Sequence, residues 1–168
     1  MKYKIYISGP DRLLKNAKEV FEHYSQLCEE YDFELLRLPD EIFNHNSDYQ
    51  TGFNLAKKRL ELIKEADIIV ADTMDFRSYV EPYSESAFEL GAGFGLNKKL
   101  YCYMLDTSTC ADRYLLEKKV DENGRVTDKN GISFEPGPVN LMLEYSSKVV
   151  PGSFEDVLKV IHKDMYGG

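Results

Sequence analysis

Two apolar segments of strand length constrain the fold most. Residues 67–73 (DIIVADT) and 99–105 (KLYCYML) are almost continuously apolar and rich in β-branched and aromatic side chains. A strand that is apolar on both faces is typical of a parallel sheet covered by helices on its two sides. A helical pattern at residues 84–97 separates the two segments. The segments therefore predict parallel strands joined by a helical crossover.

The same alternation extends over the rest of the chain. Further strands are predicted at residues 2–8, 33–38 and 148–150, and further helices at residues 13–31, 51–66, 140–146 and 153–166. Asp11 is expected to cap the first helix. Strands alternating with helices predict an α/β fold, a three-layer sandwich with a mainly parallel, Rossmann/flavodoxin-like sheet of five strands. The length of 168 residues predicts a single domain.

Two polar segments depart from this alternation. Residues 107–138 contain DENGRVTDKNG, in which two Asn-Gly pairs enclose a polar stretch. Because Asn-Gly is the preferred pair of tight hairpin turns, we expect a polar insertion that forms an exposed hairpin or a flexible segment. Residues 40–49 are predicted to form a surface loop.

Charge and composition restrict the partners and cofactors. With a net charge of -8, the chain is not expected to bind nucleic acid or an anionic membrane, since both need a basic face. No apolar run is long enough to span a bilayer and the N-terminus does not resemble a signal peptide, so a cytoplasmic protein is expected. The three cysteines and three histidines are scattered, and GAGFG lies within a helix rather than after a strand. We therefore predict no metal site and no cofactor.

The polar loop that follows the strand at residues 67–73 is the best candidate for ligand binding. Ligands of open parallel sheets bind beyond the carboxyl ends of the strands. Residues 72–82 begin at such an end, and this loop is longer than a strand–helix connection needs to be. Residues 8–10 follow the end of the first strand. Gly9 and Asp72 are thus candidates to contact a ligand.

Glu89 is the candidate nucleophile. It lies in SAFELGAGFG, a helical stretch that is otherwise mostly small and apolar. The helix dipole stabilises a carboxylate near the helix N-terminus as an anion, which is the form that a nucleophile needs. The alternative is that Glu89 is a solvated helix residue and that the glycines only allow tight packing of the helix on the sheet. Tyr6, near the end of the first strand, is either a core residue or a partner in catalysis.

Three separated segments resemble the nucleoside 2-deoxyribosyltransferase family. The N-terminal KIYISGP resembles the opening strand of that family, and GPVNLMLEYSSKVVPGSFEDVLK resembles its late NLM segment. Residues 66–100, from ADIIVADTMDFRSYVEP to SAFELGAGFGLNKKL, resemble the central signature, approximately FRG, EPD and GTAFE followed by a hydrophobic residue and Gly. The similarity spans nearly the whole chain in the right order.

The resemblance implies double displacement at a sugar carbon. Glu89 would attack C1′ of a 2-deoxynucleoside, displace the base and form a glycosyl-enzyme ester, from which a second base would take the sugar with net retention. Tyr6 would orient Glu89 by hydrogen bonding. Asn140 and Met142 would complete the pocket of a neighbouring subunit, so a homo-oligomer is expected. The remaining substrate-binding positions would be Gly9, Asp72, Phe76, Arg77, Tyr83 and Ser86.

Several positions depart from the family pattern. Tyr83 stands where the family usually has an aspartate that assists departure of the base, and a phenol is a poorer general acid than a carboxyl group. Arg59 stands where many members have an acid, and the GT of the signature is Glu85-Ser86. The missing proton could come from Glu85, Asp72 or Asp75.

Two other functions stay open. The related nucleoside 5′-monophosphate N-glycosidases use water as acceptor and hold a phosphate with serines and an arginine, roles that Arg59, Ser84 and Ser86 could fill. The second alternative is a nucleoside- or nucleotide-binding sensor with weak turnover or none. This alternative is suggested by Tyr83, which replaces the aspartate that the family usually has at this position.

Overall fold

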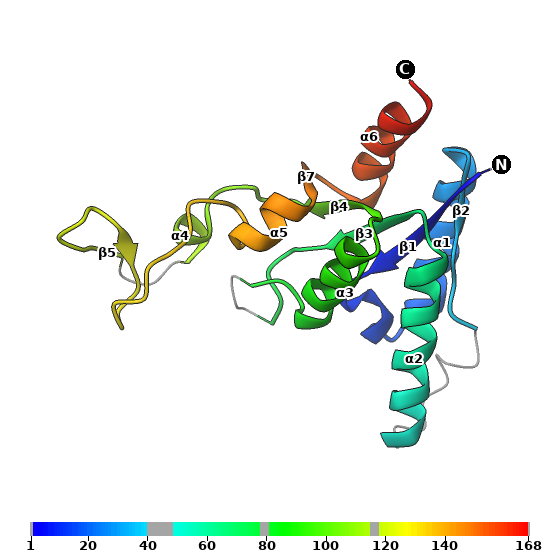
Figure 1. The fold of residues 1–168 in the computed structure, drawn as a ribbon, viewed down its shortest axis with the longest axis horizontal. Coiled ribbons are helices and arrows are strands. Elements are labelled where there is room, and N and C mark those ends of the chain that lie inside the picture. Colours follow the sequence, from blue (N-terminus) through cyan, green and yellow to red (C-terminus); the bar gives the residue numbers. More distant parts are fainter. Residues whose placement is uncertain (1, 40–48, 78–80, 115–117, 168) are drawn as a thin grey trace.

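A five-stranded sheet forms the centre of the molecule (Figure 1). This computed structural model describes residues 2–39, 49–77, 81–114 and 118–167. The strands are β1 (Tyr3–Ser8), β2 (Phe33–Leu35), β3 (Ile68–Asp72), β4 (Lys99–Met104) and β7 (Lys148–Pro151). They lie in the order β2-β1-β3-β4-β7, and every neighbouring pair is parallel. This is the strand order of flavodoxin-like sheets, so the predicted fold class is confirmed.

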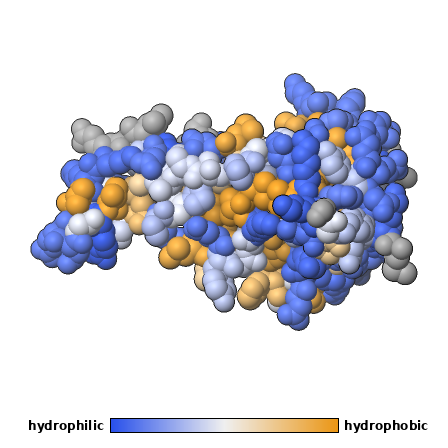
Figure 2. Space-filling model, turned by 90° about the horizontal axis from the view of Figure 1, so that it is seen from above, coloured by the Kyte–Doolittle hydropathy of each residue, from blue (hydrophilic) through white to orange (hydrophobic). Residues whose placement is uncertain are grey.

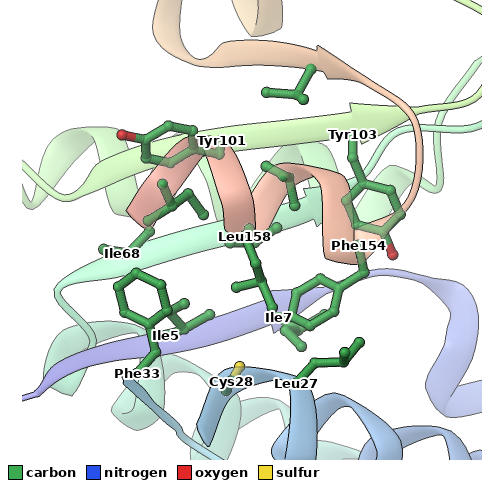
Figure 3. Close-up of a cluster of buried hydrophobic side chains, with 14 residues drawn as sticks. Ile5, Ile7, Leu27, Cys28, Phe33, Ile68, Tyr101, Tyr103, Phe154 and Leu158 are labelled. Atoms are coloured by element: carbon green, nitrogen blue, oxygen red, sulfur yellow. The ribbon is translucent and has the colours of Figure 1, made fainter. Parts of the chain in front are cut away.

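Helices cover both faces of the sheet. On one face lie α1 (Ala17–Glu30) and α6 (Phe154–Tyr166), and on the other lie α2 (Tyr49–Glu65), α3 (Ser84–Gly95) and α5 (Leu141–Ser146). Figure 3 shows the first of the two cores, where Leu158 and Cys28 from the helices pack against Ile5 and Ile7 of β1. Each large apolar side chain that is fully buried in this way stabilises the fold by about 1.5–3 kcal/mol. The three predicted layers are therefore present.

The packing of α3 on the sheet depends on one glycine. A Cβ atom on Gly93 would overlap the side chain of Ile69 and lie 3.0 Å from Leu100 Cδ2, so the helix approaches the strands more closely than any other residue would allow. At Gly91 and Gly95 an added Cβ would meet no atom within 4 Å. Tight packing therefore explains the glycine at position 93 and does not explain the other two.

The chain between β1 and α1 differs from the prediction of a single helix capped by Asp11. A short 3₁₀ helix, η1 (Pro10–Leu13), comes first, and α1 starts only after its N-cap residue Asn16. Leu14 between them is extended, with φ -70° and ψ 149°, so the helix cannot run through it. Asp11 instead accepts a hydrogen bond of 2.6 Å from the Tyr24 hydroxyl.

Other boundaries differ by a few residues. β2 ends at Leu35 rather than at residue 38, and α2 begins at Tyr49 rather than at residue 51. After β2, the Leu36 N–H still donates to the carbonyl of Ile5 at 2.8 Å, so one sheet-like hydrogen bond continues past the end of the strand. The loop predicted at residues 40–49 lies outside the described residues up to position 48.

The insertion forms an arm that projects from the body (Figure 1). Its strands β5 (Lys119–Val120) and β6 (Val126–Thr127) pair antiparallel, and Gly124 and Gly131 take positive φ angles of 79° and 80° in its two turns. The hairpin expected from the Asn-Gly pairs is thus present. The short helix α4 (Cys110–Arg113) was not predicted. Its Arg113 forms an ion pair of 3.1 Å with Asp75 of the body and donates to the Pro138 carbonyl, at the end of the insertion, at 2.8 Å.

Candidate active site

The carboxyl ends of β1 and β3 meet where the strand order of the sheet reverses. Ser8 at the end of β1 pairs with Ala71 near the end of β3. Ligands of doubly wound sheets bind in the crevice outside such a switch point. Tyr6 and Ser8 lie two residues apart on the face of β1 that α2 and α3 cover, whereas Ile5 and Ile7 face α1 and α6. The fold thus directs two hydroxyl groups toward α3.

Glu89 on α3 is the buried centre of this region. Its side chain is 4% exposed, so the alternative of a solvated helix residue is wrong. The Tyr6 hydroxyl donates a hydrogen bond of 2.7 Å to Oε1, and the Ser8 hydroxyl donates to Oε2. Nη2 of Arg59, from α2, lies 2.7 Å from Oε1 and forms an ion pair with it. Three donors, two from β1 and one from α2, therefore fix the orientation of one carboxylate.

Tyr6 remains a hydrogen-bond donor because its hydroxyl stays protonated. Burial, followed by the neighbouring Glu89 carboxylate, raises the pKa of Tyr6 far above its ordinary value. Nε of Arg59 also lies 3.2 Å from the same hydroxyl, which accepts this hydrogen bond while donating its own to Glu89. The hydrogen bond expected between Tyr6 and Glu89 is thus present, and Arg59 supports both of its members.

A line of alternating charges continues from Glu89 toward solvent. Arg59 donates to Oε2 of Glu85, and Arg12 of η1 donates to the same oxygen. Burial alone would raise the pKa of Glu85, but hydrogen bonds from Arg59 and Tyr83 and the charges of both arginines lower it to about 2. Glu85 is therefore ionised at neutral pH and cannot donate a proton to a departing group.

A cavity of about 390 Å³ opens between α2 and α3 above these charges. Its volume lies in the range of small-molecule sites. The lining combines charged side chains with an apolar wall: Arg12, Arg59, Glu85, Glu89, Gly52, Leu55, Ala56, Leu60 and Phe88. A carboxylate at the bottom of a mostly apolar cavity can attack an electrophilic carbon of a ligand whose flat, apolar part lies against the wall.

Two of the predicted substrate-binding residues, Gly9 and Asp72, lie together at the strand ends. A Cβ on Gly9 would lie 3.0 Å from Cβ of Asp72, so glycine permits this close approach. Asp72 is buried, and burial raises its pKa to about 6, although the Met74 N–H donates to it at 2.8 Å. Neither residue is among the described residues that line the Glu89 cavity.

Three further predicted residues form a group beside the cavity. The rings of Phe76 and Tyr83 are 4.8 Å apart between centroids, and the Arg77 guanidinium lies 4.9 Å from the Phe76 ring. The Tyr83 hydroxyl accepts a hydrogen bond of 2.6 Å from Arg12, which itself lines the cavity. Tyr83 is thus linked to the Glu89 site through Arg12.

The last three predicted residues have separate surroundings. Ser86, one turn before Glu89, is fully buried, and its hydroxyl has no hydrogen-bond partner among the described residues. Asn140 caps α5, its side chain accepting from the Leu143 N–H at 3.1 Å. Met142 is 76% exposed. Within the part of the chain that the structure describes, none of the three lines the Glu89 cavity.

Comparison with known proteins assigns the chain to a family. Residues 5–142 match the sequence model of the family described as nucleoside 2-deoxyribosyltransferase. The chain belongs to this family. Nucleoside 2-deoxyribosyltransferases are enzymes that transfer glycosyl groups at N-glycosidic bonds. No curated protein sequence matches the chain.

The chain is also similar to several solved structures. A 2-desoxiribosyltransferase from Leishmania mexicana is 28% identical, with a TM-score of 0.76 over 97% of this chain and 99% of that one. A conserved protein from Enterococcus faecalis V583 is 18% identical, with a TM-score of 0.51 over 98% of this chain and 100% of that one, and it shares the fold. A CMP N-glycosidase from Clostridium botulinum is 14% identical with a TM-score of 0.48, over 94% of this chain and 97% of that one.

The deoxyribosyltransferase signature did not point to all residues that contact Glu89 and Glu85. Ser8 was missed, although its position two residues after Tyr6 on one strand face was a usable signal. Arg12 was missed because nothing in the sequence links η1 to α3, 73 residues away. Arg59 was noted as a departure from the family pattern and as a candidate for holding a phosphate, but not as a partner of Glu89, and the structure places its guanidinium 2.7 Å from Oε1 of Glu89.

Neither a metal centre nor a membrane span is found in the described part of this family member. No group of three or more His, Cys, Asp or Glu side chains there could hold a metal ion. None of the helices at residues 2–39, 49–77, 81–114 and 118–167 is long and apolar enough to cross a bilayer. The cytoplasmic location stays a prediction.

Proposed function

We propose that the chain cleaves the N-glycosidic bond of a 2-deoxynucleoside and transfers the deoxyribose to another nucleobase. The observation that carries the proposal is the buried Glu89 carboxylate, held by three donors at the bottom of a cavity of nucleoside size. Membership of the family supports the reaction class, and the similar Leishmania mexicana protein is a 2-desoxiribosyltransferase.

The first step forms an ester between Glu89 and the sugar. A carboxylate oxygen attacks C1′, the bond from C1′ to the base nitrogen breaks, and its electron pair leaves with the base, which takes up a proton. Oε1 already accepts from Tyr6 and Arg59, whereas Oε2 accepts from Ser8 alone among the described residues. Oε2 is therefore the oxygen with a lone pair available for the attack. A second base then attacks C1′ and regenerates the carboxylate.

The proton on the departing base needs a different donor from Glu85. Glu85 is ionised, and Asp75 forms an ion pair with Arg113. Burial raises the pKa of Asp72 to about 6, so a fraction of its carboxyl groups still carries a proton near neutral pH. It lies at the carboxyl end of β3, next to the end of β1 that carries Ser8. We retain Asp72 as the acid.

A neighbouring subunit is part of the proposal. Asn140 and Met142 are proposed to complete the pocket of a second copy of the chain. In support, α5 exposes Met142 to 76% and Tyr145 to 84%, and Figure 2 shows apolar surface between the projecting arm and the body. Large apolar side chains that are exposed together are typical of interaction surfaces.

The test is incubation of the purified protein with deoxyadenosine and a second free base, and separately with a deoxynucleoside monophosphate. A new deoxynucleoside supports transfer, and free deoxyribose or its phosphate supports the N-glycosidase alternative. Ligand binding without base release over a long incubation supports the sensor. If Glu89→Ala retains the activity of the wild type, the assignment of the nucleophile is wrong.

A further inference from the structure

Glu85 stands between two arginines at the outer end of the Glu89 cavity. Its Oε2 accepts hydrogen bonds from Nη2 of Arg12 and Nη1 of Arg59. The side chain of Glu85 is 42% exposed, against 13% for Arg12 and 8% for Arg59. The carboxylate therefore lies on the solvent side of both guanidinium groups, and a ligand that enters toward Glu89 meets Glu85 first.

The charges that line the cavity compensate one another. Among the described lining residues, the charged side chains are two arginines and two carboxylates. Arg59 binds both carboxylates at once: Nη1 donates a hydrogen bond to Glu85, and Nη2 forms an ion pair with Glu89. Arg12 donates hydrogen bonds to Glu85 and to the Tyr83 hydroxyl. Two neighbouring arginines, one buried and one mostly buried, would make a strong anion site by themselves, and Glu85 occupies the position that an anion would take between them.

We propose that Glu85 makes the site selective for neutral 2-deoxynucleosides against their 5′-monophosphates. This inference rests on the proposed function, because it takes C1′ of the sugar to lie at Glu89. In a nucleoside, C5′ and the base lie on the same face of the sugar ring, and Glu89 attacks C1′ from the opposite face. The 5′ substituent is therefore directed away from Glu89, toward the outer part of the cavity. A phosphate there, with a charge of about -1.5 to -2, meets the Glu85 carboxylate and finds both arginines engaged.

The ionisation of Glu85 makes this selectivity permanent over the neutral pH range. Since hydrogen bonds from Arg59 and Tyr83 and the charges of both arginines hold its pKa at about 2, the carboxylate keeps its charge throughout the neutral pH range. Replacing the carboxylate by the amide of glutamine keeps the shape, removes the negative charge and leaves two guanidinium groups without their shared anion. The variant Glu85→Gln should therefore accept a phosphate where the wild type rejects one.

The experiment compares four proteins on two substrates. The kcat/KM of base release is measured with a 2-deoxynucleoside and with its 5′-monophosphate for the wild type, Glu85→Gln, Glu85→Asp and Glu61→Gln. Glu61 is the control, because it lies on α2, outside the residues that line the cavity, with a similar side-chain exposure of 49% and an ion pair to Lys58 of the same helix. Circular dichroism of each protein verifies the fold.

We expect Glu85→Gln to raise the ratio of the kcat/KM for the monophosphate to that for the nucleoside by at least about tenfold. Glu85→Asp and Glu61→Gln should keep the ratio of the wild type. An unchanged or lower ratio in folded Glu85→Gln overturns the inference. So does a wild type that prefers the monophosphate, a result that needs no variant.

Calorimetric titration with inorganic phosphate separates this inference from the proposed function. Phosphate should bind to Glu85→Gln at least about tenfold more tightly than to the wild type. If no protein releases a base but the phosphate affinity changes in this way, the proposed function fails and the role of Glu85 stands. If the phosphate affinities of the two proteins are equal, Glu85 does not control the anion site.

Discussion

The Arg59 guanidinium lies 2.7 Å from Oε1 of Glu89, and the two side chains are 8% and 4% exposed. Removing one partner of a buried ion pair leaves the other charge uncompensated, at a cost of about 3–5 kcal/mol. We expect Arg59→Met to lower the free energy of unfolding by this amount in urea titrations. The double variant Arg59→Met/Glu89→Gln should recover most of the loss. Equal losses in the single and double variants would show that the pair is not the cause.

Tyr6→Phe tests the hydrogen bond that orients the carboxylate. The substitution removes only the hydroxyl that lies 2.7 Å from Glu89. A hydrogen bond to a charged group contributes about 1.5–3 kcal/mol, so the kcat for base release should fall by about 10- to 100-fold. The control is Tyr101→Phe, which removes a hydroxyl bonded to Asp164 on the opposite face of the sheet. If both variants have the activity of the wild type, Tyr6 does not position Glu89.

Two glycines of α3 should respond in opposite directions to the same substitution. Gly93→Ala places a methyl group into the side chains of Ile69 and Leu100, and overpacking of a core costs about 1–3 kcal/mol of unfolding free energy. Gly91→Ala meets open space, so it should stabilise the helix by up to about 1 kcal/mol. Thermal unfolding of both variants checks this. A stabilised Gly93→Ala would contradict the close packing of α3 on the sheet.

Asp72→Asn should change the pH dependence of stability. The pKa of Asp72 rises from 3.8 to about 6 on folding because of burial, so the folded state binds more protons between these values and stability falls as the pH rises through this window. Because asparagine does not titrate, the variant does not lose stability in this way as the pH rises. Relative to the wild type, its unfolding free energy should therefore increase by up to about 3 kcal/mol from about pH 4 to about pH 7.

Asp121→Asn is the control for that measurement, with the opposite sign. The Arg125 amide and other donors lower the pKa of Asp121, so its carboxylate adds stability above the ordinary pKa that is lost on acidification. This variant should become less stable relative to the wild type as the pH rises. If the two variants show the same trend with pH, burial does not determine the titration of Asp72.

The strands were predictable because their signal is local. Continuous apolar runs such as residues 68–71 are typical of strands buried on both faces of a parallel sheet, and Asn-Gly pairs favour hairpin turns. The hydrogen bond between Tyr6 and Glu89 was expected from the family resemblance. The ion pairs of Glu85 were not predictable, because they join η1, α2 and α3, and no periodicity encodes contacts over 73 and 26 residues. The helical pattern also failed to predict the break at Leu14, where an extended residue separates two helical segments.

The ester on Glu89 is the central claim, and peptide mapping after a single turnover tests it most directly. The protein is mixed with a 2-deoxynucleoside without an acceptor base, quenched in acid, digested and analysed by mass spectrometry, with Glu89→Gln beside it. A deoxyribosyl group on the peptide that contains Glu89 in the wild type, and none in Glu89→Gln, is the predicted result. Stoichiometric release of the base with the sugar attached to no residue, or to a residue other than Glu89, would contradict the account.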